Sequence, residues 1–375
     1  MATRRGFFLH WLSGASALAA NIERRVRTGN WQGVTREDLP TPCLVLDLDL
    51  FEKNLSHMAV SCRAAGMNFR GHVKIHKSVD IARRQQQLGA IGVTVATEAE
   101  AELMCGAGIR GVLLTRQPAG REKTLRVAAL ARRDPSFMTV ADDPAMVEQL
   151  DAAAGAARAK LNVVVDVFAG MKRAGIEPGE KALALAQLVT KKPNLRLRGL
   201  MAYSGTASHT KGWEARKKRS LDDIRGMLET AELCKKSGLP VEIRTGGSTG
   251  TYNIDGGHLT ELQAGSYMFM DTGYAKIGSK AGSAVYDDFA QSLTVLTTVY
   301  HMTGYRSYPP YDRSSPAQTR VYNEVIRQLA EANDCLLADV WEAEGQADWL
   351  IHPDGVHANA VGNLVIGRAS CRERV

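Results

Sequence analysis

Short apolar runs alternate with longer amphipathic stretches, and this alternation most constrains the fold of the 375-residue chain. Apolar residues at helical spacing predict helices over residues 99–106, 121–132, 145–157, 181–189 and 215–237. The runs between them predict strands over residues 43–47, 68–73, 92–96, 111–115, 137–140, 162–167, 197–203, 241–245 and 260–264. Strands that alternate with helices form parallel sheets, because each helix returns the chain to the start of the next strand.

Without the first strand, eight strands remain, which is the number that closes an α/β barrel of the (β/α)8 TIM type. The alternative is an open, doubly wound sheet. No Gly-x-Gly-x-x-Gly motif follows the first strand, and polar residues gather where the strands end. Both features favour the barrel, in which the carboxyl ends of all strands face one mouth.

The composition excludes several classes of protein. The 47 Lys and Arg against 40 Asp and Glu give a net charge of +7, and the basic residues form no long block. Nucleic acid is therefore not an expected partner, and no apolar run is long enough to span a membrane. The 6 cysteines are scattered without a Cys-x-x-Cys pair, which argues against a disulfide framework and against a zinc ribbon.

Two predicted strand ends carry residues suited to a reactive, phosphate-bearing ligand. Lys74 ends one strand, and partial desolvation in a barrel mouth would lower its pKa and free its amine for a Schiff base. The turn at residues 245–251 is rich in glycine and hydroxyl residues, whose backbone N–H groups can hold a phosphate. The simpler alternatives are a solvated basic turn and a flexible loop.

Two further strand ends supply an arginine and a tyrosine. Arg173 follows the strand at 162–167 and could reach into the mouth as a donor, or it could be an ordinary surface arginine. Tyr203 ends the strand at 197–203 and could donate to a ring nitrogen, or it could cap the core. In a barrel these side chains would share one rim with Lys74.

Seven segments of residues 41–299 resemble, in order, the fold-type III pyridoxal-phosphate enzymes, in particular the D-threonine aldolase and D-serine dehydratase-like group and, more distantly, alanine racemase. The segments are TPCLVLDLD, HVKIHK, GVTVATEAEAE, VDVFAGMKRAG, GLMAYSGTASH, TGGSTGTYNID and ELQAGSYMFMD. The resemblance implies a barrel with pyridoxal 5′-phosphate in its mouth. It also implies a β-domain built from the N-terminal strand and C-terminal residues.

The resemblance assigns roles residue by residue. Lys74 matches the Schiff-base lysine, Arg173 the arginine near the phenolic oxygen of the cofactor, and Tyr203 the tyrosine near its pyridine ring. The phosphate would lie against Gly247, Ser248, Thr249, Gly265 and Ser266.

Four other positions bear on the resemblance. His76 and Gln263 match motif positions of less defined role, and we predict His76 to be catalytic together with Lys74 and Tyr203. The family usually has Arg-Pro-His and Lys-Thr-His where this chain has Gly71 and Ile75. We expect Gly71 to loosen the turn and Ile75 to remove a hydroxyl near the cofactor.

The family pattern stops near residue 299. Family members continue with strands and a short motif that binds a divalent metal, Mn or Zn, and its ligands are missing from their expected setting. Residues 300–365, with a predicted helix at 318–333 and strand at 335–340, instead resemble the end of an SGNH or GDSL-type hydrolase. Asp354 and His357 would be its Asp-x-x-His pair, but no Gly-Asp-Ser turn supplies a nucleophile. Alternatively, His352, Asp354 and His357 are metal ligands.

The two ends of the chain need separate interpretations. Residues 1–20 resemble a twin-arginine export signal, with Arg4 and Arg5 before a short apolar run and small residues, although a frayed arm is the alternative. The expected location is periplasmic with such a signal and cytoplasmic without it. Residues 366–375 resemble a translated sequencing adapter, and we interpret them as an artefact.

The resemblance implies a pyridoxal-phosphate-dependent lyase that acts on β-hydroxy D-amino acids. It would cleave threonine to glycine and an aldehyde, or convert serine to pyruvate and ammonia. The substrate is a small amino acid, and a homodimer is implied because family members are often dimers. We expect the replaced C-terminal region to impair turnover more than cofactor binding. The alternatives are a racemase-like enzyme, a non-catalytic pyridoxal-phosphate-binding protein and an SGNH hydrolase fragment.

Overall fold

The computed structural model describes residues 43–171 and 173–296, together with residues 25, 28, 298–299 and 338–339. The chain divides into two units, one of Leu50–Gln291 and one of Met1–Asp49 with Ser292–Val375. The export signal at 1–20, the adapter-like residues at 366–375 and the predicted helix at 318–333 lie outside the described residues. The same holds for His352, Asp354 and His357.

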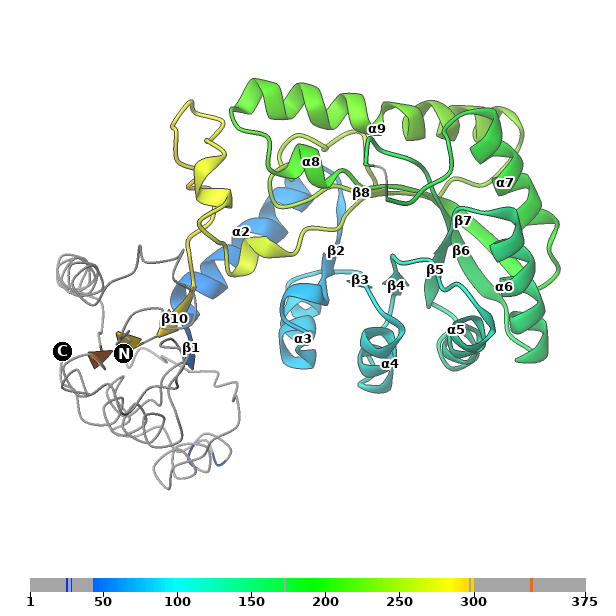
Figure 1. Ribbon diagram of the computed structural model, residues 1–375, viewed down its shortest axis with the longest axis horizontal. Helices are drawn as coiled ribbons and strands as arrows, with labels where there is room; N and C mark the ends of the chain where they lie inside the picture. Colours follow the sequence, from blue (N-terminus) through cyan, green and yellow to red (C-terminus); the bar gives the residue numbers. More distant parts are fainter. Residues whose placement is uncertain are drawn as a thin grey trace, which may run out of the picture. The chain divides into compact units, whose positions relative to one another are not determined.

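Eight parallel strands of the larger unit close into a barrel (Figure 1). They are β2 (Asn68–His72), β3 (Gly92–Val95), β4 (Val112–Leu114), β5 (Met138–Ala141), β6 (Leu161–Asp166), β7 (Leu195–Ala202), β8 (Ile243–Gly246) and β9 (Glu261–Leu262). The ring closes where β2 pairs with β9, with Asn68 opposite Glu261 and Phe69 opposite Leu262. This closure confirms the predicted (β/α)8 barrel and excludes the open sheet.

Helices cover the outside of the barrel (Figure 1). They are α2 (Leu48–Ala64), α3 (Val79–Gln87), α4 (Glu98–Gly106), α5 (Arg121–Arg133), α6 (Pro144–Ala156), α7 (Glu180–Lys191) and α9 (Trp213–Lys236). The five predicted helices are confirmed as α4, α5, α6, α7 and α9. The short α8 (Gly205–Ser208) follows β7. The sequence analysis predicted neither α2 nor α3, and most residues of α3 are polar.

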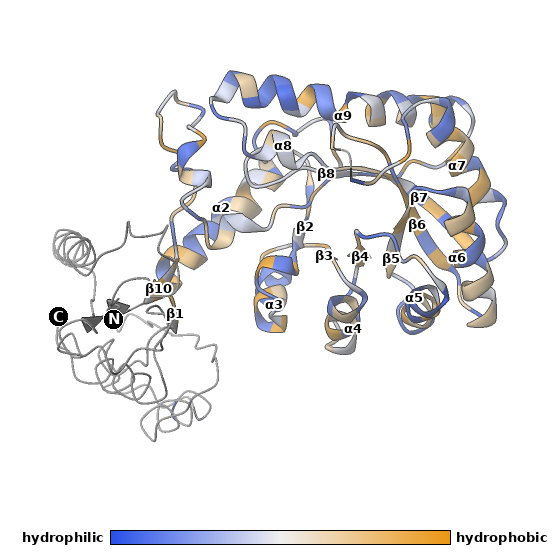
Figure 2. Cartoon of the chain, viewed as in Figure 1, coloured by the Kyte–Doolittle hydropathy of each residue, from blue (hydrophilic) through white to orange (hydrophobic). Residues whose placement is uncertain are grey.

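Side chains at helix starts explain where several helices begin. Ser78, Thr97 and Asp143 precede α3, α4 and α6, and each accepts hydrogen bonds from backbone N–H groups of the first turn. Figure 2 shows apolar residues concentrated on strands such as β6 and β7, whereas the helices carry both polar and apolar residues. This pattern is typical of amphipathic helices that bury one face against a barrel.

The barrel has two apolar layers. The larger cluster lies between strands and helices and includes Val163 and Val165 of β6. Val164 lies between them in sequence and belongs to a second cluster, whose members are Leu113, Met138, Val140, Val164, Met201 and Ile243. Because successive residues of a strand point to opposite faces, this second cluster fills the barrel interior below the mouth.

The smaller unit contains two short sheets. In the first, β1 (Cys43–Leu46) pairs antiparallel with β10 (Leu293–Leu296), as the implied β-domain requires. In the second, β11 (Thr298–Val299) pairs in parallel with β12 (Ala338–Asp339), which falls inside the strand predicted at 335–340. No helix in the described part of the chain is both long and apolar enough to cross a membrane.

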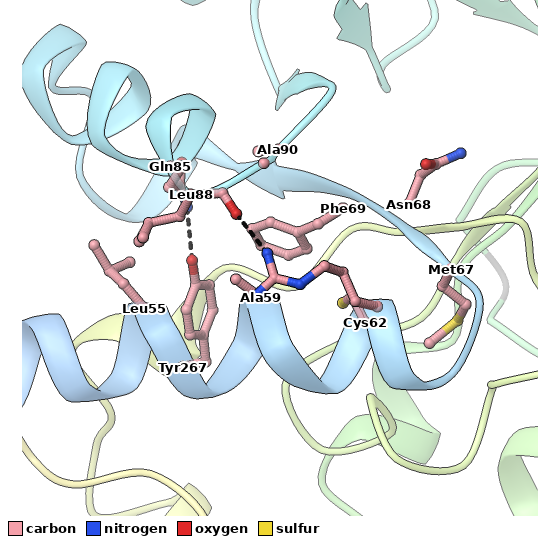
Figure 3. Close-up of a pocket in the computed structure, with 12 residues that line it drawn as sticks. Leu55, Ala59, Cys62, Met67, Asn68, Phe69, Gln85, Leu88, Ala90 and Tyr267 are labelled. Atoms are coloured by element: carbon pink, nitrogen blue, oxygen red, sulfur yellow. Dashed lines mark hydrogen bonds between the residues drawn. The ribbon is translucent and has the colours of Figure 1, made fainter.

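Gly71 lies inside β2, within the strand predicted at 68–73, so the expectation that it loosens a turn was wrong. A Cβ atom at this position would lie 2.6 Å from Nε2 of Gln85 and 3.0 Å from the Phe69 ring. Nε2 of Gln85 donates to the hydroxyl of Tyr267 at 2.9 Å, beside a cavity of about 90 Å³ (Figure 3). Glycine at this position therefore lets the buried Gln85 side chain pack against the strand.

Candidate active site

A cavity of about 540 Å³ opens where the barrel strands end. Its lining comes from the carboxyl ends of β2, β3, β4, β6, β7 and β9, the position at which active sites form in such barrels. The lining residues are His72, Lys74, Ala96, Thr97, Thr115, Arg116, Gln117, Arg173, Ala174, Met201, Tyr203 and Gln263.

Lys74 enters the cavity from the 3-10 helix η2 (Val73–Ile75), which directly follows β2. Its Nζ lies 5.5 Å from the centre of the Tyr203 ring. Burial lowers the pKa of Lys74, and the positive charge of Arg173 lowers it further, whereas the carboxylate of Glu100 acts in the opposite direction. The neutral amine, which is the nucleophilic form, is therefore more accessible here than on a solvated lysine.

Arg173 and Lys74 both lie against the ring of Tyr203. The Arg173 guanidinium carbon is 5.4 Å from the ring centre, so the tyrosine has two cations within cation–π range. Burial raises the pKa of Tyr203, and Arg173 partly offsets this rise. The structure thus brings together the lysine, arginine and tyrosine that the sequence placed on three separate strand ends.

His72 was missed by the sequence analysis, although it is the first residue of the HVKIHK segment. Its Nδ1 accepts from the backbone N–H of Lys74 at 3.3 Å, so the neutral ring carries its proton on Nε2. Nε2 lies 3.5 Å from Oγ1 of Thr115, which itself donates to the carbonyl of Val95 at 3.0 Å. Burial and the nearby cations lower the pKa of His72 to about 3, so the ring stays neutral.

His76 does not line the cavity. Its Nδ1 accepts from the backbone N–H of Ser78 at 2.9 Å, and its buried Nε2 has no partner among the described residues. Burial lowers the pKa of His76 to about 4. Ile75, the last residue of η2, is 45% exposed and also lies outside the lining. The structure therefore brings His72 into the cavity in place of the predicted His76.

The five predicted phosphate-binding residues follow the neighbouring strands β8 and β9, next to Gln263 of the cavity wall. Oγ1 of Thr249 accepts from the backbone N–H of Tyr267 at 2.9 Å, which joins the two turns. Gly247 has a φ of 71°, and a Cβ there would lie 2.6 Å from Cδ1 of Leu262.

These turns have free donors. Among the described residues, none accepts a hydrogen bond from the backbone N–H of Gly247, Thr249, Gly265 or Ser266. By contrast, the N–H of Ser248 donates to Oγ1 of Thr251 at 3.0 Å. Unpaired N–H groups on two adjacent turns suit a phosphate, although none of the five predicted residues lines the 540 Å³ cavity itself.

Gln117 connects the cavity to two carboxylates behind its wall. Its Nε2 donates to Oδ2 of Asp166 at 2.8 Å and to Oδ2 of Asp142 at 3.0 Å. Asp142 also accepts from the backbone N–H of Gly175 at 2.9 Å. Burial, assisted by the charge of Asp142, raises the pKa of Asp166 to about 7, although the Gln117 hydrogen bond and Arg173 oppose the rise.

The raised pKa of Asp166 predicts a pH-dependent loss of stability. The fold raises this pKa from 3.8 to about 7, so the folded protein retains a proton that the unfolded chain has already released. Stability contributed by this group therefore falls as the pH rises through that window. The free energy of unfolding of Asp166→Asn minus that of the parent should therefore increase by up to about 1.4 kcal/mol for each unit of pH rise in this window.

Urea denaturation of parent and variant at several pH values across this window measures the difference. Asp287→Asn, at an exposed position, is the control for the loss of one carboxylate. Comparing variant with parent cancels the opposite contribution of His72 and His76, whose lowered pKa values make stability rise with pH. Parallel pH profiles for Asp166→Asn and the parent would contradict the prediction.

The part of the chain that the structure describes contains no group of three or more His, Cys, Asp and Glu arranged to hold a metal ion. The tail residues proposed above as alternative metal ligands lie outside that part.

The family model, the related sequences and the solved structures all match the part of the chain that forms the barrel. The family model of the alanine racemase N-terminal domain matches residues 46–273. The chain is 34% identical over 271 residues to 3-hydroxy-D-aspartate aldolase of Paracoccus denitrificans (strain Pd 1222), covering 71% of this chain and 70% of that protein. It is 36% identical over 264 residues to D-threonine aldolase of Arthrobacter sp, covering 69% and 68%. The crystal structure of D-threonine aldolase from Filomicrobium marinum matches 72% of each chain, with 36% identity and a TM-score of 0.64.

Proposed function

Since the chain belongs to the alanine racemase N-terminal domain family, we propose that it is a pyridoxal 5′-phosphate-dependent lyase that acts on β-hydroxy D-amino acids. The observation that carries the proposal is the position of Lys74. It is the one lysine among the described residues that line the cavity, its pKa is lowered by burial, and it lies against Tyr203. Curated relatives at 34% and 36% identity are aldolases of D-amino acids, which supports the same reaction class here.

The residues of the site fit this cofactor. Free backbone N–H groups at Gly247, Thr249, Gly265 and Ser266 offer donors for its phosphate. Lys74 offers the amine that its aldehyde needs. When bound, pyridoxal 5′-phosphate supplies a ring that accepts the electron pair left by breaking a bond to Cα.

The remaining side chains hold this arrangement in place. Arg173 and Tyr203 lie beside Lys74 and would orient a cofactor bound to its amine. His72 fixes the backbone at Lys74 through Nδ1 and points its Nε2 proton at Thr115. Because the pKa of His72 is about 3, its ring stays neutral near pH 7. His72 therefore adds no positive charge beside Lys74 in this pH range.

The test supplies the cofactor-loaded protein with D-threonine, L-threonine, D-serine and D-alanine, with and without Mn²⁺ or Zn²⁺. A D-specific aldolase releases glycine and acetaldehyde from D-threonine but not from L-threonine. A dehydratase instead forms pyruvate and ammonia from D-serine. Conversion of D-alanine to L-alanine without these products would support the racemase alternative. A visible cofactor band without any product would overturn the lyase proposal in favour of a binding protein.

A further inference from the structure

A fully buried arginine lies near the start of α9. Arg216 has no exposed surface, and its guanidinium donates to four backbone carbonyls. Nε donates to Gly250 at 2.8 Å and Nη2 to Gly278 at 2.8 Å, whereas Nη1 donates to Thr210 at 3.1 Å and to Ile277 at 2.8 Å. These contacts join three loops, and one of the loops is the turn predicted to hold a phosphate.

No carboxylate of the described residues forms an ion pair with Arg216. Asp288, whose charge acts on Arg216 from a distance, accepts from the hydroxyl of Tyr252 at 2.9 Å. Asp255 accepts from the hydroxyl of Ser220, one helical turn along α9, at 2.7 Å. A buried charge is costly when no opposite charge lies close to it. An anion bound on the other side of the turn would therefore reduce the cost of burying Arg216.

Arg216 and Tyr286 together hold two carbonyls of the turn at 245–251. The hydroxyl of Tyr286 donates to the carbonyl of Thr249 at 2.6 Å, and Arg216 binds the next carbonyl, that of Gly250. The guanidinium carbon of Arg216 lies 5.5 Å from the centre of the Tyr286 ring. Because the C=O and N–H of a trans peptide point in opposite directions, the N–H of Gly250 is directed away from the Tyr286 hydroxyl. None of the described residues accepts a hydrogen bond from this N–H, which adds a donor to those of the turn.

We propose that Arg216 is a positioning residue for the phosphate of the cofactor. Its hydrogen bond to Gly250 fixes the turn, so that the N–H groups of Gly247, Thr249 and Gly250 stay available to the phosphate. Its buried charge favours a dianion on the opposite side of the same turn. The effect of Arg216 is therefore specific to the phosphate and absent for the same ring without one. This inference rests on the proposed function, which supplies the phosphate-bearing cofactor.

Titration with two ligands that differ by the phosphate tests this role. Pyridoxal 5′-phosphate and pyridoxal carry the same ring and aldehyde, so both can react with Lys74. After removal of the cofactor, absorbance titration should show that Arg216→Gln weakens the binding of pyridoxal 5′-phosphate about 10- to 100-fold, and that of pyridoxal less than about 3-fold. Arg225→Gln, at an exposed position of α9, is the matched control and should change the binding of neither ligand.

Tyr286→Phe keeps the test decisive if Arg216→Gln does not fold. This variant removes the hydroxyl that holds Thr249 and keeps the ring beside Arg216, so no buried charge is lost. It should weaken the binding of pyridoxal 5′-phosphate about 3- to 10-fold and leave that of pyridoxal unchanged. Equal losses for both ligands would overturn the inference, because they would show a purely structural role, and so would unchanged binding of pyridoxal 5′-phosphate. Selective loss of pyridoxal 5′-phosphate binding in a protein that cleaves no D-amino acid would overturn the proposed lyase and retain the role of Arg216.

Discussion

Lys74→Ala is expected to abolish the visible absorption band of lysine-bound pyridoxal 5′-phosphate and to reduce kcat/KM by on the order of 10³-fold or more. The physical reason is that the described residues lining the cavity include no second lysine. Lys77, the next lysine in sequence, has a side chain that is 61% exposed and pairs with Glu100. It therefore cannot replace the lost amine without breaking that pair.

Absorbance spectroscopy of the cofactor-loaded parent and variant gives the first measurement, and steady-state kinetics gives the second. Lys276→Ala, at an exposed lysine of the 3-10 helix η4 (Tyr274–Lys276), is the matched control and should keep both the band and the activity. We expect phosphate contacts to retain some cofactor in Lys74→Ala as an unlinked aldehyde. A persisting band in Lys74→Ala would place the cofactor on another lysine and contradict the assignment.

Glu261→Ala is expected to destabilise the fold by about 3–5 kcal/mol, because it leaves the buried Arg70 without its carboxylate. Arg70 donates to Glu261 through Nε at 2.9 Å and Nη2 at 2.8 Å, and both side chains are 4% exposed. Nη1 of Arg70 also donates to the carbonyl of Gly111. The pair joins β2 to β9, where the barrel closes, so its loss acts on the seam of the ring.

Chemical denaturation measures this loss, and an exposed pair supplies the control. Arg84 and Glu52 also form a two-pronged pair, but both side chains are 40% exposed, so Glu52→Ala should cost less than about 1 kcal/mol. The double variant Arg70→Met/Glu261→Leu should recover most of the lost stability, because it removes the unpaired charge as well. Equal costs for Glu261→Ala and Glu52→Ala would contradict the prediction, and the double variant keeps the test decisive if Glu261→Ala does not fold.

The order of the elements could be predicted because it depends on local periodicity. The spacing of apolar residues within one segment is enough to predict whether that segment forms a strand or a helix. The prediction failed where local sequence is ambiguous. The stretch VDIARRQQQ forms α3, yet only three of its residues are apolar, and of these only Ile81 and Ala82 are buried. The need for glycine at position 71 could not be predicted, because the side chain that packs against it, Gln85, comes from another element.

Some residues of the candidate site could likewise be predicted from sequence, and others could not. Lys74, Arg173 and Tyr203 could be named from sequence because each ends a predicted strand and matches a motif, and the structure brings all three to one cavity. The choice between His72 and His76 could not be made from sequence. His72 ends β2 and His76 directly follows η2, so only the path of the chain through η2 decides which ring faces the cavity.

The sequence by itself determined a parallel barrel, the lysine at the end of its first strand and the family to which the chain belongs. Only the tertiary structure decided that His72 and not His76 lines the cavity, and which carboxylates lie behind Gln117. The physical reason is that periodicity and motifs act within single segments. The charge and burial of a site arise when ring closure brings loops from distant parts of the chain together.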